Sequence, residues 1–216
     1  MKAIHWHTKS RRRFGRRNPT AGSPLAGYRQ ASALAADQGT LGQVSRVSLK
    51  APGPIAARHV LADFDSGEPA LDEWLKRRAL RNHASGASRC FVLCSGEAVV
   101  GYYCLSAGAI SHEASPKSMR RNMPDPLPVL LLGRLAIDRR FQNQGIGRAL
   151  LRDAMLRAVN VAQDAGVFAV LVHSISEQAT RFYLSRGFVL SPLQASTLLM
   201  TIATLREVLS EPDGKS

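Results

Sequence analysis

The chain of 216 residues is poor in cysteine and aromatic residues and has no long apolar segment. No apolar run approaches the roughly 18 residues that a membrane-spanning helix needs, so the sequence predicts no contact with a membrane. The basic N-terminus is followed by Gly, Pro, Ala and Ser instead of an apolar stretch with a cleavage site, which argues against a secretory signal. We therefore expect a cytoplasmic protein.

The cysteines Cys90, Cys94 and Cys104 are too few, and odd in number, for a disulfide framework. All three lie in apolar segments, which predicts buried free thiols in a reducing compartment. A metal site is the alternative, but neither the cysteine spacing nor a nearby histidine pair supports it. We predict that no metal is bound.

Acidic residues are also scarce, with 16 Asp and Glu against 29 Lys and Arg, a formal charge of +13. Residues 1–46 carry nine of these basic residues and one acid, a charge of +8, and the remainder carries +5. The excess in the remainder weakly favours a polyanionic partner. Most of the charge, however, lies outside the part of the chain with regular hydrophobic patterning.

The N-terminal 46 residues show no sustained helix or strand periodicity, and they contain an arginine cluster at positions 11, 12, 13, 16 and 17. This composition buries too little apolar surface to offset the entropy of ordering, so we predict a basic, disordered extension. A nucleic-acid-binding arm is one interpretation. A translated leader from a start codon assigned too early is the other, and we favour it. Residues 47–216 are predicted to form the folded domain.

Hydrophobic periodicity begins after Pro54. Residues 69–84 predict a helix, because Leu71, Trp74, Leu75 and Ala79 recur at helical spacing. Two strands, 89–94 and 98–105, are predicted with a tight turn between them. Residues 111–128 contain four prolines and predict an irregular loop.

The second half of the chain alternates between strands and helices. Residues 129–137 and 167–172 predict buried strands, and an amphipathic helix is predicted between them at 147–165. A short helix at 176–185, a strand at 196–201 and a helical turn at 204–209 follow. This order predicts a mixed α/β fold with one sheet and helices on its faces.

The motif that indicates chemistry lies between the strand ending at Asp138 and the helix starting at Gly147. A strand leads through a glycine-containing loop into a long helix, whose unpaired N–H groups and positive dipole end favour a phosphate. Gly145 and Gly147 let the backbone approach an anion, and Arg148 adds positive charge. A plain glycine-rich loop before a helix is the alternative interpretation. A dinucleotide site is excluded, because the chain lacks both the fingerprint Gly-x-Gly-x-x-Gly and an acid at the end of the next strand.

Two segments resemble the GNAT superfamily of N-acetyltransferases. Leu135-Ala136-Ile137-Asp138 followed by Gln142-x-x-Gly145-x-Gly147 is similar to its central motif. Ala179-x-x-Phe182-Tyr183-x-x-x-Gly187-Phe188 is similar to its second signature, a helix that carries a tyrosine and ends in Gly-Phe. The resemblance implies a GNAT fold, a single mixed and mostly antiparallel sheet with helices on both faces, and acetyl-CoA as acetyl donor.

The resemblance also implies the positions that hold the coenzyme: Leu135, Ala136, Ile137, Gln142, Asn143, Gln144, Gly145, Ile146, Gly147, Arg148, Ala149, Ser176, Ala179 and Phe182. Ser176 stands where many members carry Asn.

A narrower resemblance covers most of residues 55–210. The segments Phe64-x-Ser66-Gly67, Leu71-Asp72-x-Trp74-Leu75, Gly86-Ala87-Ser88-Arg89, Gly101-Tyr102-Tyr103 and Arg120-Arg121-Asn122-Met123-Pro124-Asp125-Pro126 are similar to the GNAT toxins of bacterial toxin–antitoxin pairs. This resemblance implies acetylation of the α-amine of an aminoacyl-tRNA, which stops translation. It further implies a ribbon-helix-helix antitoxin as partner and a homodimer.

The resemblance implies direct acetyl transfer within a ternary complex, with Tyr183 as general acid toward the departing thiolate. A phenol of pKa about 10 suits that role, whereas the alternative is a core aromatic, for which Phe182 is the better candidate. A backbone N–H near Ala136 or Ile137 would stabilise the oxyanion. No general base is evident, and we interpret His112, Glu113 and His173 as structural or surface residues.

Binding of tRNA phosphates would fall to basic residues, with Arg89 ranked first among Lys76, Arg77, Arg81, Arg89, Arg120 and Arg121. A solvated helix face is the alternative for each of them. Two other functions stay open: a GNAT enzyme acting on a protein N-terminus, a lysine or a small amine, and a nucleic-acid-binding module that uses the N-terminal arginines.

Overall fold

The computed structural model describes residues 49–210. The predicted N-terminal extension, residues 1–46, lies outside the described residues. Within the described part, no helix is both long and apolar enough to cross a membrane.

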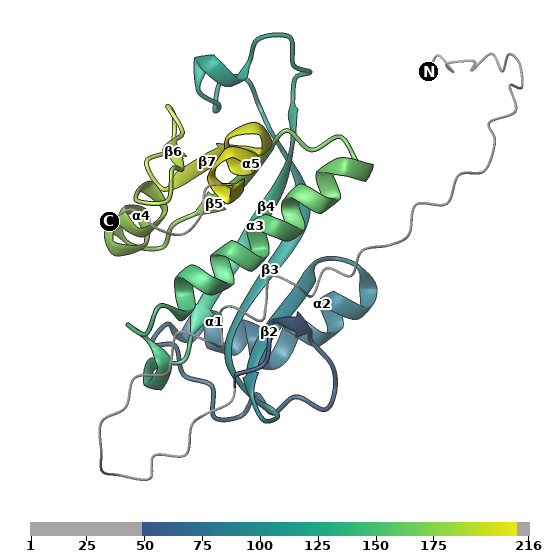
Figure 1. The fold of residues 1–216 in the computed structure, drawn as a ribbon, viewed down its shortest axis with the longest axis vertical. Helices are drawn as coiled ribbons and strands as arrows, with labels where there is room; N and C mark the ends of the chain where they lie inside the picture. The colour runs from purple at the N-terminus through teal and green to yellow at the C-terminus, as the bar shows by residue number, and fades with distance from the viewer. Residues whose placement is uncertain (1–48, 211–216) are drawn as a thin grey trace, which may run out of the picture. The chain divides into compact units, whose positions relative to one another are not determined.

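Seven strands form one sheet in the order β1-β2-β3-β4-β5-β7-β6, and β4–β5 is its parallel pair (Figure 1). The sheet is therefore mixed and mostly antiparallel, which confirms the predicted fold class. The strands are β1 (Gly53–Pro54), β2 (Arg89–Ser95), β3 (Ala98–Ile110), β4 (Leu127–Ile137), β5 (Ala169–His173), β6 (Val189–Leu190) and β7 (Thr197–Thr201).

One face of the sheet is covered by the helical segment that the apolar spacing predicts. It consists of α1 (Pro69–Trp74), a π-helical turn η2 (Leu75–Ala79) and α2 (Leu80–Ser85). Trp74 and Leu75 are buried against the sheet, where the Trp74 ring stacks on that of Tyr102 at 6.0 Å. Two short 3-10 turns, η3 (Lys117–Met119) and η4 (Arg139–Phe141), lie in loops.

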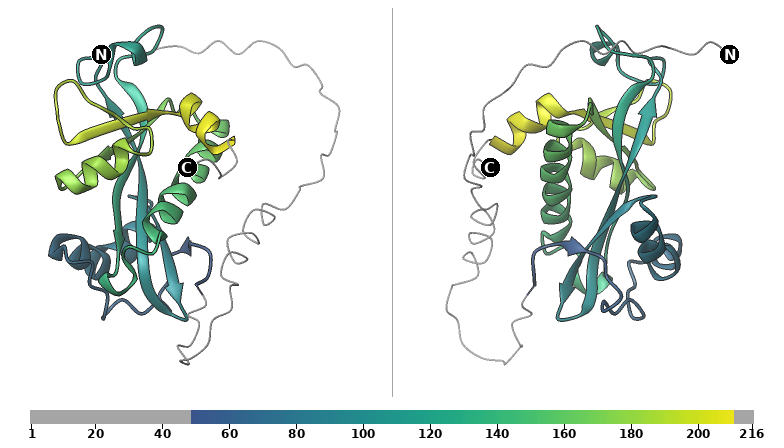
Figure 2. Two further views of the ribbon diagram at one scale, coloured as in Figure 1. Left: turned by 60° about the vertical axis from the view of Figure 1, so that its left-hand side comes forward. Right: turned by 90° about the vertical axis from the view of Figure 1, so that its right-hand side faces the viewer.

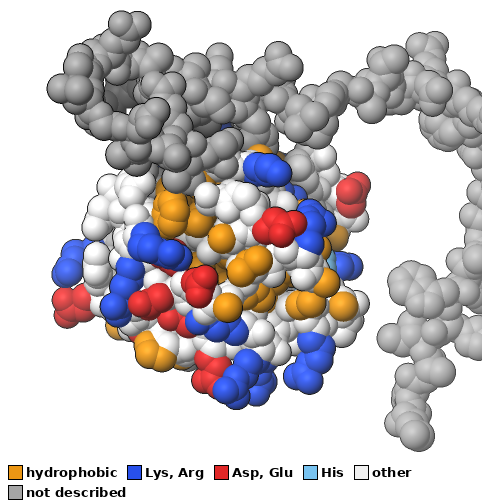
Figure 3. Space-filling view, turned by 90° about the horizontal axis from the view of Figure 1, so that it is seen from below, with side chains coloured by type: hydrophobic (Ala, Val, Ile, Leu, Met, Phe, Trp, Pro, Cys, Tyr) orange, Lys and Arg blue, Asp and Glu red, His pale blue; other side chains and the backbone are white. Residues whose placement is uncertain are grey.

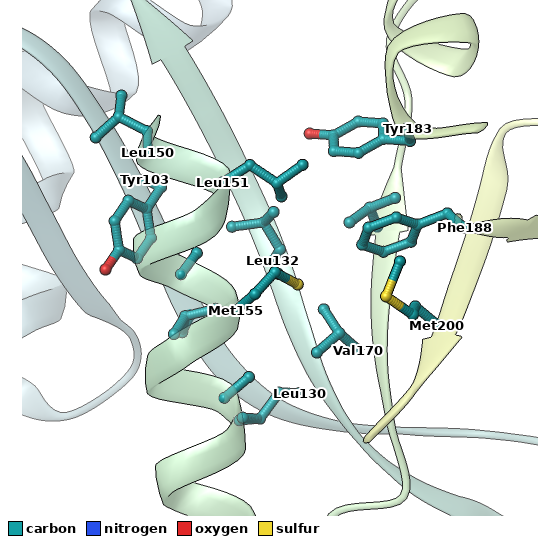
Figure 4. Close-up of a cluster of buried hydrophobic side chains, with 14 of the residues drawn as sticks. Tyr103, Leu130, Leu132, Leu150, Leu151, Met155, Val170, Tyr183, Phe188 and Met200 are labelled. Atoms are coloured by element: carbon teal, nitrogen blue, oxygen red, sulfur yellow. The ribbon is translucent and has the colours of Figure 1, made fainter. Parts of the chain in front are cut away.

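The opposite face carries α3 (Ile146–Asp164), as the views of Figure 2 show. α4 (Glu177–Leu184) and α5 (Ile202–Ser210) complete the fold. The apolar stripe of α3 packs on β4 and β5 in one large cluster, which also contains Tyr183 and Phe188 (Figure 4). Cys90, Cys94 and Cys104 are buried free thiols, as predicted.

The predicted strand boundaries were wrong in two places. β3 continues to Ile110 instead of ending at Leu105, because it pairs with β4 over its whole second half. β4 begins at Leu127, so Pro128 lies inside the strand and not in the preceding loop. Pro128 is tolerated because it lies near the start of the strand, where a missing N–H donor costs the ladder little. Its carbonyl accepts a hydrogen bond from the Phe168 N–H at 2.9 Å.

The strands β1 and β6 were not predicted from the sequence. Each has only two residues and lies at an edge of the sheet, where it pairs with one neighbouring strand. A segment of two residues is too short for an alternating pattern to be recognised.

Candidate active site

The pairing of β4 with β5 stops halfway along β4. The two strands are paired from Val129–Ala169 to Leu132–Val172. β4 then continues to Ile137 with β3 as its partner. Residues 133–137 are called here the open edge of β4, since within the described chain no strand pairs with them on the side of β5. Unpaired backbone groups along such an edge can bind an extended ligand as an added strand.

A β-bulge marks the start of the open edge. Cys104 is opposite Arg134 and Leu105 is opposite Leu132, so Gly133 has no partner in β3. A bulge bends its strand and increases the local twist, which directs the end of β4 away from β5. The sequence held a signal for this feature that we did not use: a glycine inside an apolar strand often marks a bulge.

The start of α3 follows the open edge and keeps the geometry expected for an anion site. Gly145 is the N-cap in the left-handed region at φ 77°, and no side chain caps the helix there. The first backbone bond of the helix runs from the Ala149 N–H to the Gly145 carbonyl at 3.1 Å. N–H groups ahead of Ala149 therefore point out of the helix start, where an anion is stabilised.

Gly147 has a second constraint that the sequence did not reveal. A Cβ at this position would lie 2.9 Å from Cδ1 of Ile137, at the end of β4. The absence of a side chain thus lets the first turn of α3 pack directly against the open edge. Gly145, in contrast, is required by its positive φ, because a Cβ there would meet no atom within 4 Å.

The loop before α3 is held in place by its own polar side chains. The Gln142 Nε2 donates to the carbonyls of Ser66 and Ile137, both at 2.9 Å. Gln144 donates to the Arg140 carbonyl at 3.1 Å. Asn143 adopts φ 60°, a conformation that Asn tolerates better than most residues. The amide of Gln142 is thus engaged in bracing the loop, a role that the sequence analysis did not assign.

Asp138 anchors the same loop and was not among the predicted site residues. Its buried carboxylate accepts hydrogen bonds from the Arg140 Nε and a terminal nitrogen of its guanidinium, both at 2.8 Å, and from two backbone N–H groups. The hydrogen bonds from the Arg140 side chain hold the pKa of Asp138 below its usual value, despite burial. The carboxylate therefore stays charged and fixes the exit of β4.

Tyr183 lies on α4 and is buried in the main core cluster. Its ring packs edge-on against Phe182 at 5.3 Å and Phe188 at 5.5 Å. Its hydroxyl points away from Phe188 and Met200, toward α3 and β4 (Figure 4). Burial raises the pKa of Tyr183 to about 12, so the phenol is protonated at neutral pH. The expectation that Phe182 is the better core residue was wrong: Phe182 is only partly buried.

The first turn of α4 is closed by Ser176, whose Oγ accepts a hydrogen bond from the Ala179 N–H at 3.1 Å. This cap uses the Ser176 hydroxyl within the protein. Ser176 and Ala179 thereby set the direction of the helix that carries Tyr183. Their contact with a coenzyme stays a prediction.

The six basic residues predicted to bind tRNA fall into two groups. Lys76, Arg77 and Arg81 are exposed on the helix, and Arg89 is exposed beside its end, where it donates to the His83 carbonyl at 3.4 Å. Arg77 also pairs with Glu73 at 3.1 Å. The other group, Arg120 and Arg121, lies in the loop between β3 and β4, at the top of Figure 1.

Arg120 differs from the rest of the predicted set because its guanidinium braces its own loop. It donates to the Ser115 carbonyl through two nitrogens, at 2.8 Å and 2.5 Å. Because the two groups lie on different elements, the helical segment with β2 and the loop between β3 and β4, the six residues do not form one patch. Viewed from below, toward the end at which α3 begins, Lys and Arg alternate with acidic and apolar side chains (Figure 3).

The histidines interpreted as structural do make structural contacts. The His112 ring interacts with the Pro124 carbonyl at 2.9 Å, and His173 interacts with the Thr197 hydroxyl at 2.9 Å. Among the described residues, no group of three or more His, Cys, Asp or Glu is placed to hold a metal ion.

Comparison with known proteins places this geometry in a family. Residues 86–190 match the model of the Acetyltransferase (GNAT) domain. A tRNA-acetylating toxin of Mycobacterium tuberculosis is 44% identical over 161 residues, which span 74% of this chain and 97% of the relative.

Two solved structures agree with that match. AtaT complexed with acetyl-methionyl-tRNA is similar with a TM-score of 0.70 and 30% identity, over 76% of this chain and 100% of that one. A mutant AtaT toxin bound to the C-terminus of the antitoxin AtaR and to acetyl-CoA is similar with a TM-score of 0.66 and 28% identity, over 76% and 99% of the two chains.

Proposed function

The chain belongs to the GNAT family of acetyltransferases, and from this premise we propose that it is the toxin of a toxin–antitoxin pair. It transfers an acetyl group from acetyl-CoA to the α-amine of an aminoacyl-tRNA, and the blocked amine can no longer accept a peptide. The similarity to a tRNA-acetylating toxin over 97% of that protein supports the substrate.

The observation that carries the proposal is the end of the β4–β5 pairing at Leu132 and Val172, with the hydroxyl of Tyr183 directed toward α3 and β4. β4 thereby supplies a backbone edge, α3 a helix start without a side-chain cap, and α4 a protonated phenol. These are the groups that binding and transfer from a thioester of coenzyme A require.

Acetyl-CoA fits the residues that are present. Its pantetheine arm would pair with the backbone of Leu135, Ala136 and Ile137, and its pyrophosphate would accept hydrogen bonds from the first N–H groups of α3. The loop residues 142–145 form the approach to this helix start, and Arg148 and Ala149 continue it. Ser176, Ala179 and Phe182 would border the arm from α4.

The transfer combines bond formation, bond cleavage and proton transfer at the reacting atoms. The neutral amine of the acceptor attacks the thioester carbonyl carbon, while a backbone N–H of the open edge near Ala136 or Ile137 stabilises the developing oxyanion. The C–S bond then breaks, and Tyr183 donates its proton to the departing thiolate. The proton lost by the amine passes to solvent, and solvent restores the proton of Tyr183.

The tRNA phosphates would contact the basic residues on and beside the first helical segment: Lys76, Arg77, Arg81 and Arg89. Arg121 would contribute from the loop between β3 and β4. Arg120 would hold that loop in shape, since its guanidinium is hydrogen-bonded to the Ser115 carbonyl.

We also propose the partners and setting of the enzyme. AtaT has been solved with the C-terminus of its antitoxin AtaR, which supports an antitoxin as partner of this chain. We propose that this antitoxin is a ribbon-helix-helix protein, that the enzyme is a homodimer and that it acts in the cytoplasm.

The acceptor is the part of the proposal that an experiment can separate from other GNAT activities. Purified enzyme is incubated with radiolabelled acetyl-CoA and four acceptors in turn: charged tRNA, a peptide with a free N-terminus, a lysine peptide and a small amine. We expect label on charged tRNA and none on uncharged tRNA, which serves as control. Label on the peptides or the small amine alone would assign the enzyme to another GNAT activity.

A further inference from the structure

The gap between β4 and β5 opens beside His173. The last pair that joins the two strands is Leu132–Val172, so His173 is the first residue of β5 beyond the paired part. It is also the last residue of that strand, and it is exposed. His173 therefore lies at the closed end of the gap, and the open edge of β4 forms the other side of the same gap.

His173 lies on the face of the sheet that is opposite to α3 and Tyr183. Successive side chains of a strand point to opposite faces. Val170 and Val172 pack in the core cluster of α3, whereas Leu171 packs in a separate cluster, and the His173 side chain follows the direction of Leu171. Since α3, α4 and the proposed coenzyme arm occupy the first face, the acceptor amine has access to the thioester from the face of His173.

An imidazole is the one side chain of these two strands that can take up a proton near neutral pH. In β4 and β5, both fully described, the ionisable residues are Arg134 and His173. The guanidinium of Arg134 lies over the Trp74 ring, 4.2 Å from its centroid. A guanidinium already carries its proton and cannot act as a base. The imidazole of His173 is therefore the base that the two strands place at the gap.

The hydrogen bonds around His173 decide which ring nitrogen carries the proton. His173 and Thr197 lie opposite each other in β5 and β7, and Nδ1 is 2.9 Å from the Thr197 hydroxyl oxygen. That hydroxyl donates its single hydrogen to Oε1 of Gln194 at 2.8 Å, so it accepts a hydrogen bond from Nδ1–H. The neutral ring thus keeps an unprotonated Nε2, which has no hydrogen-bond partner among the described residues.

We propose that His173 is the general base of acetyl transfer and that Thr197 positions it. The amine nitrogen attacks the thioester carbonyl carbon, and Nε2 of His173 accepts one amine hydrogen as the C–N bond forms. The C–S bond breaks, and Tyr183 protonates the thiolate. Because His173 is exposed, the imidazolium returns its proton to solvent. The inference rests on the proposed active site, but it applies to any amine acceptor.

A purely structural role of His173 is the competing interpretation, because its bond to Thr197 also joins β5 to β7. His173→Asn separates the two roles. Asn keeps an amide N–H near the place of Nδ1–H, but it has no basic nitrogen at the place of Nε2. We expect the single-turnover rate of acetylation at saturating charged tRNA to fall about 100-fold or more. The melting temperature and the affinity for acetyl-CoA should not change.

His112→Asn is the matched control. His112 lies in the loop between β3 and β4, where its ring interacts with the Pro124 carbonyl at 2.9 Å. The same substitution there should leave the single-turnover rate at the wild-type value. A fall of equal size in both variants would overturn the inference.

Chemical rescue supplies a readout that a structural role would not move. In His173→Ala, free imidazole can enter the place of the lost ring, so the rate should rise with imidazole concentration, and more strongly for substituted imidazoles of higher pKa. Thr197→Val removes the acceptor of Nδ1–H. It should lower the rate less than His173→Asn does, and imidazole should not restore that loss.

A wild-type rate in His173→Asn, or a rate of His173→Ala that does not respond to imidazole, would overturn the inference. Each variant is assayed with the acceptor that the wild type labels in the comparison of four acceptors. A failure of tRNA as the acceptor therefore contradicts the proposed function and leaves the test of His173 intact.

Discussion

At the scale of single residues, Tyr183 decides whether the proposed chemistry is right. In Tyr183→Phe the ring and its packing against Phe182 and Phe188 stay, while the proton donor is lost. We expect acetyl transfer to fall about 100- to 10,000-fold. The melting temperature and the affinity for acetyl-CoA should change little, because the phenylalanine ring keeps the packing of the tyrosine ring in the core cluster.

Tyr103→Phe is the matched control, since it removes the hydroxyl of a second buried tyrosine. That hydroxyl donates to Asp153, so its loss should destabilise the fold by about 1 to 3 kcal/mol without touching transfer. Wild-type turnover in Tyr183→Phe, or an equal loss in both variants, would remove Tyr183 from the role of general acid.

The pKa of Tyr183 also determines how kcat/KM for acetyl transfer depends on pH. Because burial raises it to about 12, the phenol is protonated over the whole working range and loses its proton only above that range. The acceptor amine must be neutral to attack, and α-amines have a pKa near 8. We expect kcat/KM to rise with pH and then stay level to about pH 9. A fall in rate between about pH 7 and pH 9 would indicate an acid with a lower pKa.

At the scale of elements, the contact between α3 and the open edge of β4 controls coenzyme binding. A Cβ at Gly147 meets Ile137 at 2.9 Å, so Gly147→Val must push the helix start away from the strand. We expect the affinity for acetyl-CoA to fall at least about 10-fold, measured by calorimetry. Gly166→Ala, beyond the other end of α3 where a Cβ meets nothing within 4 Å, is the control and should bind normally.

Unchanged affinity in Gly147→Val would place the pyrophosphate away from this helix start. A loss of equal size in Gly166→Ala would mean that the effect on affinity does not come from the contact between α3 and the end of β4.

The elements themselves were largely predictable, because long helices and buried strands impose their period on the sequence. The helix at 69–84 and the helix at 147–165 were found within one or two residues of their observed ends. The strand β6 and the bulge at Gly133 were not, since neither extends over enough residues to show a period. The second half of β3 was missed because exposed small residues, Ala107 to Ala109, hide its pattern.

The site was predictable only where a motif of adjacent residues encodes it. The glycines of the loop, Tyr183 and the helix start came from the sequence. The bracing of that loop by Asp138 and by the Ser66 carbonyl joins positions about 70 residues apart, and no local pattern reports such contacts.

At the scale of the whole molecule, residues 47–216 should fold and act alone. The first 46 residues carry +8 of the net charge and no apolar period, so we expect their deletion to leave the melting temperature and the acetylation rate unchanged. Differential scanning fluorimetry and the transfer assay on both chains check this. Loss of folding in the shorter chain would show that the N-terminal segment belongs to the domain.

The central claim is that the acetyl group ends on the amine of an aminoacyl-tRNA. Charged tRNA is incubated with enzyme and acetyl-CoA, digested to its terminal aminoacyl-adenosine and weighed by mass spectrometry, with Tyr183→Phe in parallel. We expect the aminoacyl-adenosine to gain the mass of one acetyl group with the wild type, and fragmentation to place it on the α-amine. An aminoacyl-adenosine of unchanged mass, while acetyl-CoA is consumed with another acceptor, would contradict the account.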